Sequence, residues 1–140
     1  MTYVSEALRR FVTERAFGRC EYCQSPKMIV VTMVLDHIIP VAAGGATIPE
    51  NLCLTCVGCN LFKSDFEVAV DPLSQQGVPL YNPRDQVWDE HFAWSPDGTL
   101  IEGVTAIGRA TIERLQMNRT EVVRARQMWV KAGWHPPQRV

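Results

Sequence analysis

Four cysteines of this chain are spaced as ligands of one metal ion. They form two C-x2-C pairs that flank residues 24–55: Cys20, Cys23, Cys56 and Cys59. Each pair is a tight turn that directs two sulfur atoms at one point. Four thiolates around one ion give the closed tetrahedral coordination of structural zinc. We therefore predict one structural Zn²⁺ ion.

Two other interpretations of the cysteines are weaker. A pair of disulfides needs an oxidising compartment, and the N-terminus, which Glu6, Arg9 and Arg10 interrupt, shows no secretory signal. A redox C-x2-C motif needs one pair of cysteines, whereas two are present. The fifth cysteine, Cys53, lies between two leucines, and we expect it to be a buried free thiol.

The segment from Cys20 to Lys63 predicts the order strand, loop, strand, helix. An apolar run from Met28 to Leu35, rich in Val and Ile, indicates the first strand. Proline and glycine residues then force a loop, and the chain returns in a short strand from Asn51-Leu52. The turn from Cys56 to Cys59 opens a helix.

Three polar residues are expected to converge between this hairpin and the helix: Asp36, His37 and Asn60. The carboxylate and the amide offer hard oxygen ligands, which suit Mg²⁺ or Mn²⁺. The imidazole of His37 can accept a proton near neutral pH. Phosphodiester hydrolysis needs a base and a cation that stabilises developing charge. The residues therefore predict a metal-dependent nuclease site.

The segment resembles an HNH endonuclease domain, the ββα-metal fold, in the form with a four-cysteine zinc site. The resemblance covers 44 of 140 residues. Its motifs are Asp-His-Ile-x-Pro at 36–40, Gly-Gly at 44–45, Asn-Leu at 51–52 and Cys-x2-Cys-Asn-x2-Lys at 56–63. The last motif carries Asn60 where the family name has His, a variation within the family.

The resemblance implies a role for each residue of the site. His37 would be the general base, and Asn51 would brace the loop and orient that base. Asp36 and Asn60 would hold the catalytic Mg²⁺ or Mn²⁺ ion. The substrate would be double-stranded DNA, and cleavage of both strands by a single site would need a homodimer or two encounters.

A non-catalytic, zinc-stapled module that binds nucleic acid or protein is the alternative function. Such a module has no need for His37 at nuclease spacing from Asp36 and Asn60. We therefore favour the enzyme.

The remaining segments predict an α+β fold around this core. A helix over 5–17, begun by Ser5 within the N-terminal segment 1–19, would pack on the core at 20–65. In the C-terminal extension, 66–140, prolines and glycines predict an irregular wrap over 66–86. Residues 87–104 predict a β-hairpin with aromatic residues on one face as a small satellite core: Trp88, Phe92 and Trp94.

Two helices, 105–116 and 119–132, are predicted to end the extension. Thr105 is placed to cap the first helix, and Asn118 and Glu121 have the spacing of a capping box for the second. We expect the tail that contains His135 to be frayed.

Charge is unevenly distributed along the chain. The formal net charge is −1, which argues against strong non-specific DNA binding. Residues 105–140, however, carry seven basic and two acidic residues. We therefore predict phosphate contacts from these helices and from the core residue Lys63: Lys63, Arg109, Arg114, Arg124, Arg126 and Lys131. Solvated helix faces with intrahelical ion pairs are the alternative.

Composition places the chain among globular proteins. Hydrophobic residues make up 46% of the sequence, and no apolar run approaches the roughly 20 residues that a membrane-spanning helix needs. We expect a cytoplasmic protein that is not bound to membranes.

Overall fold

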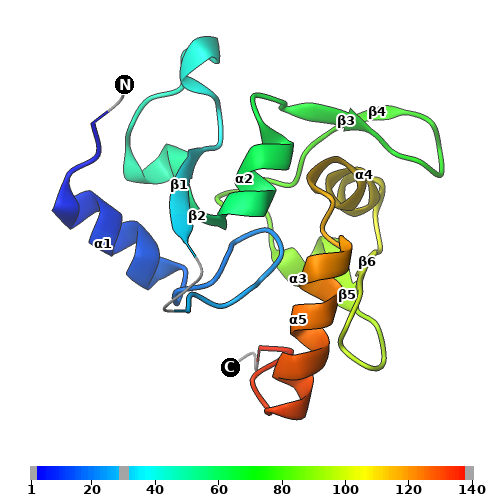
Figure 1. Ribbon diagram of the computed structural model, residues 1–140. Coiled ribbons are helices and arrows are strands. Elements are labelled where there is room, and N and C mark those ends of the chain that lie inside the picture. Colours follow the sequence, from blue (N-terminus) through cyan, green and yellow to red (C-terminus); the bar gives the residue numbers. More distant parts are fainter. Residues whose placement is uncertain (1–2, 29–31, 138–140) are drawn as a thin grey trace. The chain divides into compact units, whose positions relative to one another are not determined.

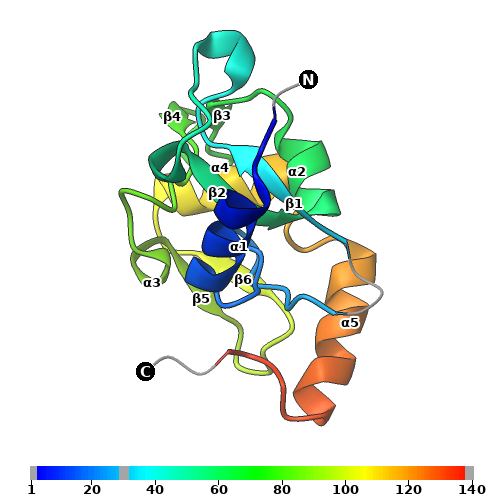
Figure 2. The ribbon, with the colours of Figure 1, turned by 90° about the vertical axis from the view of Figure 1, so that its left-hand side faces the viewer.

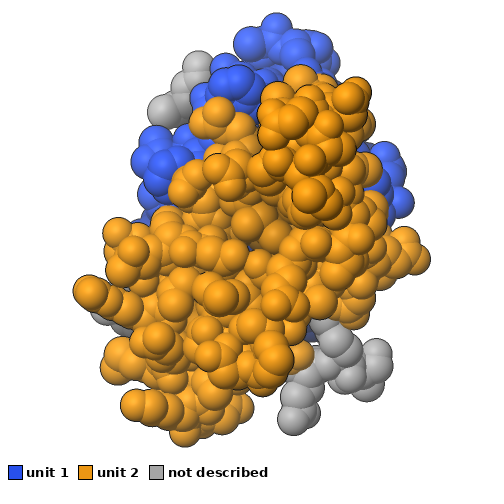
Figure 3. Space-filling view, turned by 90° about the vertical axis from the view of Figure 1, so that its right-hand side faces the viewer, with its two compact units in different colours: residues 1–67, 82–86 blue, residues 68–81, 87–140 orange. Residues whose placement is uncertain are grey.

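The chain crosses three times between two structural units. The computed structural model describes residues 3–28 and 32–137. Unit 1 contains Met1–Glu67 and Asn82–Gln86, and unit 2 contains Val68–Tyr81 and Val87–Val140 (Figure 3). The short segment Asn82–Gln86, which the sequence assigned to the extension, therefore belongs to the same unit as the cysteines.

Unit 1 is built on two strands and one helix (Figure 1). Strand β1 (Met33–His37) pairs antiparallel with β2 (Leu52–Cys56), and His37 lies opposite Leu52. Helix α2 (Val57–Lys63) follows β2 directly. The predicted ββα order of the core is thus confirmed. The first strand differs in its bounds, because β1 includes His37, and residues 29–31 of the predicted strand lie outside the described residues.

Two glycines shape the loop between β1 and β2. Gly44 has φ 90° and ends the short helix η1 (Val41–Ala43) in a left-handed conformation. A Cβ atom at Gly45 would lie 1.8 Å from Ile39 O and 2.9 Å from Asn51 Nδ2. Only glycine allows the loop to close this tightly on the side chain of Asn51, the last residue of η2 (Pro49–Asn51).

Helix α1 (Glu6–Arg15) covers the hairpin of unit 1 (Figures 1 and 2). Ser5 begins the helix as predicted, and its hydroxyl accepts a hydrogen bond of 3.1 Å from Leu8 N. The buried side chain of Val12 packs with Leu52 and Leu54 of β2. This apolar core is small for a folded unit, so unit 1 depends on further cross-links.

In unit 2, the predicted irregular wrap contains a short hairpin. Strand β3 (Val68–Val70) pairs with β4 (Gly77–Pro79). The connecting turn is organised by Asp71, whose carboxylate accepts hydrogen bonds from the backbone N–H groups of Leu73 and Ser74. The prediction was wrong here because three-residue strands are too short to show an alternating pattern.

The predicted hairpin at 87–104 is shorter than expected. Trp88–His91 forms helix α3, and only β5 (Phe92–Trp94) and β6 (Ile101–Gly103) pair. The backbone carbonyl of His91 accepts from Val104 N at 3.0 Å, so it anchors the end of α3. The predicted aromatic cluster is confirmed, because the ring centroids of Trp88 lie 5.0 Å from Phe92 and 5.3 Å from Trp94.

Helices α4 (Ala106–Leu115) and α5 (Thr120–Lys131) complete unit 2. Thr105 caps α4 as predicted, with a bond of 3.0 Å from Gly108 N. The predicted capping box of α5 is absent from the described residues. Asn118 instead forms two 2.8 Å hydrogen bonds with the backbone of Ile101.

The tail after α5 is packed at His135, contrary to the predicted fraying. His135 is buried, and its ring centroid lies 4.3 Å from that of Trp94. None of the helices within 3–28 and 32–137 has the length and apolar character of a membrane span.

Replacement of Arg126 by methionine should destabilise unit 2 by about 3 kcal/mol, since buried acceptors would lose their donor. The fully buried guanidinium donates to Thr99 O, to Asn118 Oδ1 and to Met117 O at 2.6–3.0 Å. All four tryptophans of the chain belong to unit 2. Tryptophan fluorescence during urea unfolding therefore reports on this unit.

The matched control for this prediction is Arg124→Met. Arg124 is exposed on α5, so its loss should change stability by no more than about 0.5 kcal/mol. Equal effects of the two variants would contradict a structural role for Arg126.

Candidate functional site

The four predicted cysteines gather at one point in unit 1. Their sulfur atoms all lie within 4.8 Å of one another, and all four residues are buried: Cys20, Cys23, Cys56 and Cys59. The sulfur atoms of Cys23 and Cys56 are 3.7 Å apart. Tetrahedral zinc with Zn–S bonds of about 2.3 Å requires sulfur separations of about 3.8 Å. The cluster can bind a metal ion, and its donor set is the one zinc prefers.

The local backbone explains how these sulfur atoms meet. Cys56 ends β2 in an extended conformation and is the N-cap of α2, where its sulfur accepts from Cys59 N at 3.4 Å. The second turn is closed by Cys20, whose carbonyl accepts from Gln24 N at 2.8 Å. Cys53 is a buried free thiol, as expected, and does not belong to the cluster.

Electrostatics within the cluster favour a bound cation. Hydrogen bonds from Cys20, Cys23 and Cys59 lower the pKa of the Cys56 thiol. Burial raises the pKa of Cys20 well above its ordinary value. Several thiolates at this spacing repel one another, so the protein alone does not stabilise four. A divalent cation would supply the missing positive charge.

The structure brings Asp36 and Asn60 together across β1 and α2. The amide nitrogen of Asn60 donates to Asp36 Oδ1 at 3.3 Å. The amide thus faces the carboxylate with its nitrogen, and the predicted oxygen ligand requires the amide to turn over. Lys63 contacts the other carboxylate oxygen at 3.0 Å. Burial raises the pKa of Asp36, although the charge of Lys63 opposes this.

His37 is held by the loop rather than by α2. Its Nε2 atom lies 2.9 Å from the hydroxyl oxygen of Thr47. Successive side chains of a strand point to opposite faces, and within the described residues no hydrogen bond joins His37 to Asp36 or Asn60. Thr47 was not predicted, because its only signal in the sequence is its place after the Gly-Gly motif.

The side chain of Asn51 bridges the loop that follows His37. Its amide oxygen accepts from Ile39 N at 2.8 Å, and its amide nitrogen donates to Ile39 O at 3.0 Å and to Ala46 O at 2.9 Å. This places Asn51 where it fixes the loop next to Thr47. The geometry is compatible with the bracing role that the family resemblance implies.

Several residues predicted to contact phosphate have other partners. Arg126 is fully buried, so this prediction was wrong. Arg109 forms a two-bond ion pair with Asp71, at 2.9 Å for each bond, and lowers the pKa of that carboxyl. Lys63 is buried beside Asp36. The residues left at the surface of α4 and α5 are Arg114, Arg124 and Lys131, of which Arg114 is half-buried.

A partly buried network beside the cysteines was not predicted. The carboxylate of Glu21 accepts from Leu54 N at 2.8 Å and forms an ion pair with Arg84. Arg15 of α1 donates to Pro49 O and Leu52 O at 2.9 and 2.6 Å. These charged groups fix the Asn82–Gln86 segment and α1 within unit 1. Their sequence separation explains why no local pattern revealed them.

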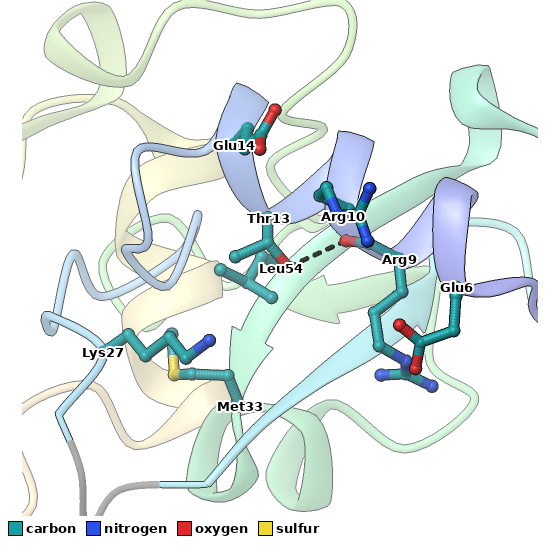
Figure 4. Close-up of a pocket in the computed structure, with 8 residues that line it drawn as sticks. All are labelled: Glu6, Arg9, Arg10, Thr13, Glu14, Lys27, Met33 and Leu54. Carbon is teal, nitrogen blue, oxygen red and sulfur yellow. Dashed lines mark hydrogen bonds between the residues drawn. The ribbon is translucent and has the colours of Figure 1, made fainter.

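A cavity of about 440 Å³ lies beside α1 in unit 1 (Figure 4). None of the predicted nuclease residues lines this cavity, so it is separate from that site. Eight residues line it: Glu6, Arg9, Arg10, Thr13, Glu14, Lys27, Met33 and Leu54. Its acidic and basic side chains are mixed. The lining therefore specifies no ligand.

Comparison with protein families gives one match. Residues 20–66, about a third of the chain, match the family described as HNH endonuclease. The match contains the cysteine cluster, β1, β2 and α2. No curated protein and no solved structure matches the chain.

We predict about one equivalent of zinc in protein purified without added metal. Cys20→Ala should lose most of this zinc and unfold unit 1, because metal binding and folding are coupled in such sites. Elemental analysis and circular dichroism measure the two effects. Cys53→Ala is the matched control, which removes a buried thiol outside the cluster and should retain the metal. Equal zinc contents in wild type and Cys20→Ala would exclude the four-cysteine site.

Proposed function

Because residues 20–66 form a domain of the HNH endonuclease family, we propose that the protein is a metal-dependent endonuclease that hydrolyses DNA phosphodiester bonds. The observation that carries this proposal is the contact of Asn60 with Asp36 at 3.3 Å, on the strand that also bears His37. This contact brings a carboxylate and an amide, distant in sequence, together at the end of the strand that carries His37. This is the chemistry that the reaction needs.

His37 is the proposed general base. Thr47 contacts Nε2, and its hydroxyl can accept the Nε2–H hydrogen bond. In that tautomer the lone pair of Nδ1 is available to take a proton from water. Thr47 would then be a positioning residue, and Asn51 would hold the loop that carries it.

Asp36 and Asn60 are the proposed ligands of a catalytic Mg²⁺ or Mn²⁺ ion. Such an ion would stabilise negative charge on the phosphate and on the leaving oxygen. Asp36 contributes a buried carboxylate, and Asn60 contributes its amide oxygen once the amide turns over. The donor set fits a hard cation.

Double-stranded DNA is the proposed substrate, and Arg114, Arg124 and Lys131 of α4 and α5 are the proposed contacts to its backbone. A chain with one His37 cleaves one strand at a time. Cleavage of both strands therefore needs a homodimer or two encounters. The second candidate function is a zinc-stapled binding module without catalysis. It is favoured by the ion pair of Asp36 with Lys63, because the lysine already neutralises the carboxylate.

His37→Ala should lower plasmid cleavage in Mg²⁺ or Mn²⁺ by at least about 100-fold, the effect of losing a general base. Zinc content and DNA binding should be retained, since His37 holds neither metal in this assignment. EDTA should abolish wild-type cleavage. His91→Gln, a change in unit 2, should cleave at nearly the wild-type rate. Wild-type cleavage by His37→Ala would exclude this base, and DNA binding without any wild-type cleavage would support the binding module.

Neutralising Arg114, Arg124 and Lys131 to glutamine should weaken DNA binding. The slope of log affinity against log salt should fall by about one for each lost phosphate contact. Fluorescence anisotropy with labelled duplex DNA measures this slope. Gln127→Ala, an uncharged change on exposed α5 surface, is the control. A salt slope unchanged by the triple variant would mean that these helices do not contact the backbone.

A further inference from the structure

We infer that Lys63 is a built-in competitor for the catalytic cation and sets how tightly Asp36 binds it. The inference rests on the proposed function of Asp36 as a cation ligand. Lys63 was predicted to contact phosphate, but in the structure it forms an ion pair with Asp36.

The ammonium group of Lys63 is fully engaged within unit 1. It lies 3.0 Å from Asp36 Oδ2, 3.4 Å from His37 O and 3.5 Å from Ile38 O. An ammonium has three N–H donors, and three acceptors surround it. Lys63 therefore has no donor left for a phosphate while this arrangement holds.

Burial shows that this lysine is not a solvated helix residue. The side chains of Lys63 and Asp36 are only 2% and 7% exposed. A buried charge is costly unless it is paired. Each of these two charges therefore depends on the other, and the last turn of α2 is held to β1 by this pair.

The same pair opposes the binding of a second cation. Lys63 contacts Oδ2 of Asp36, while the Asn60 amide donates to Oδ1. A divalent ion at this carboxylate would either displace Lys63 from Oδ2 or bind beside it against the repulsion of its positive charge. The ammonium and the divalent ion thus compete for the same carboxylate, and an opposite charge at this distance typically changes the affinity of a carboxylate for a proton by about tenfold or more.

Lys63→Met tests the competition, because it keeps the length of the side chain and removes the charge. Zinc-loaded protein would be titrated with Mn²⁺, with free Mn²⁺ followed by electron paramagnetic resonance. We expect the variant to bind Mn²⁺ at least about tenfold more tightly than wild type, the effect of one neighbouring charge on a carboxylate. Lys63→Arg should remain near wild type. Lys27→Met, which removes an exposed lysine of the same unit, should leave the affinity unchanged.

A second measurement follows local stability by hydrogen exchange rather than metal binding. Without Mn²⁺, Lys63→Met leaves Asp36 buried without its cation, so amide hydrogen exchange in β1 and α2 should accelerate. Saturating Mn²⁺ should restore protection in the variant. Lys63→Met with Asp36→Asn should remove both the excess Mn²⁺ affinity and the rescue.

Unchanged or weaker Mn²⁺ binding by Lys63→Met would overturn the inference, as would a failure of both wild type and variant to bind Mn²⁺. The first outcome is distinct from failure of the proposed function, whereas the absence of Mn²⁺ binding in both proteins would also remove Asp36 as a proposed cation ligand. Wild-type cleavage that requires Mn²⁺, combined with no gain of affinity in Lys63→Met, would leave the nuclease in place and remove only the competition.

Discussion

The four sulfur atoms gathered within 4.8 Å are the constraint on which unit 1 depends. Among the described residues of this unit, the buried apolar cluster contains Val12, Leu52 and Leu54, with four partly buried neighbours. So small a core does not offset the conformational entropy of ordering the chain. A metal ion at the cluster would join the turn at Cys20 to the junction of β2 and α2. The position of α2 on the hairpin, and therefore of Asn60 beside Asp36, follows from that junction.

Buried and partly buried charged side chains supply the remaining cross-links in both units. Unit 1 uses Glu21 with Arg84 and Asp36 with Lys63. Unit 2 uses Asp71 with Arg109, and a buried Arg126 that donates to backbone carbonyls. Such groups stabilise one arrangement specifically, because a shift of either partner leaves an uncompensated charge in the interior. Half of the basic residues assigned to DNA on the basis of charge alone are in fact parts of this framework.

The sequence was informative where one residue type has one physical use. Cysteine spacing located the metal cluster and the start of α2, the Ser5 and Thr105 caps located two helix starts, and the apolar run with the Pro and Gly residues after it located the hairpin. It failed where the partner is distant. Asn118 has capping-box spacing but bonds to Ile101, and Arg126 follows a basic pattern but is buried. In each case a tertiary partner satisfied the polar group better than solvent or the local helix end.

Asp36 and His37 are adjacent in sequence but differ in burial, as their proposed roles require. Its strand neighbour Asp36 is buried and contacts α2, so a cation there would be bound by a fixed, largely desolvated carboxylate. His37 itself is half-buried and is oriented by Thr47 from a loop that Asn51 and Gly45 keep closed. A base needs access to water, whereas a cation ligand gains strength from burial. Asp36 and His37 are the last two residues of β1, so the end of one strand supplies both a buried and an accessible group.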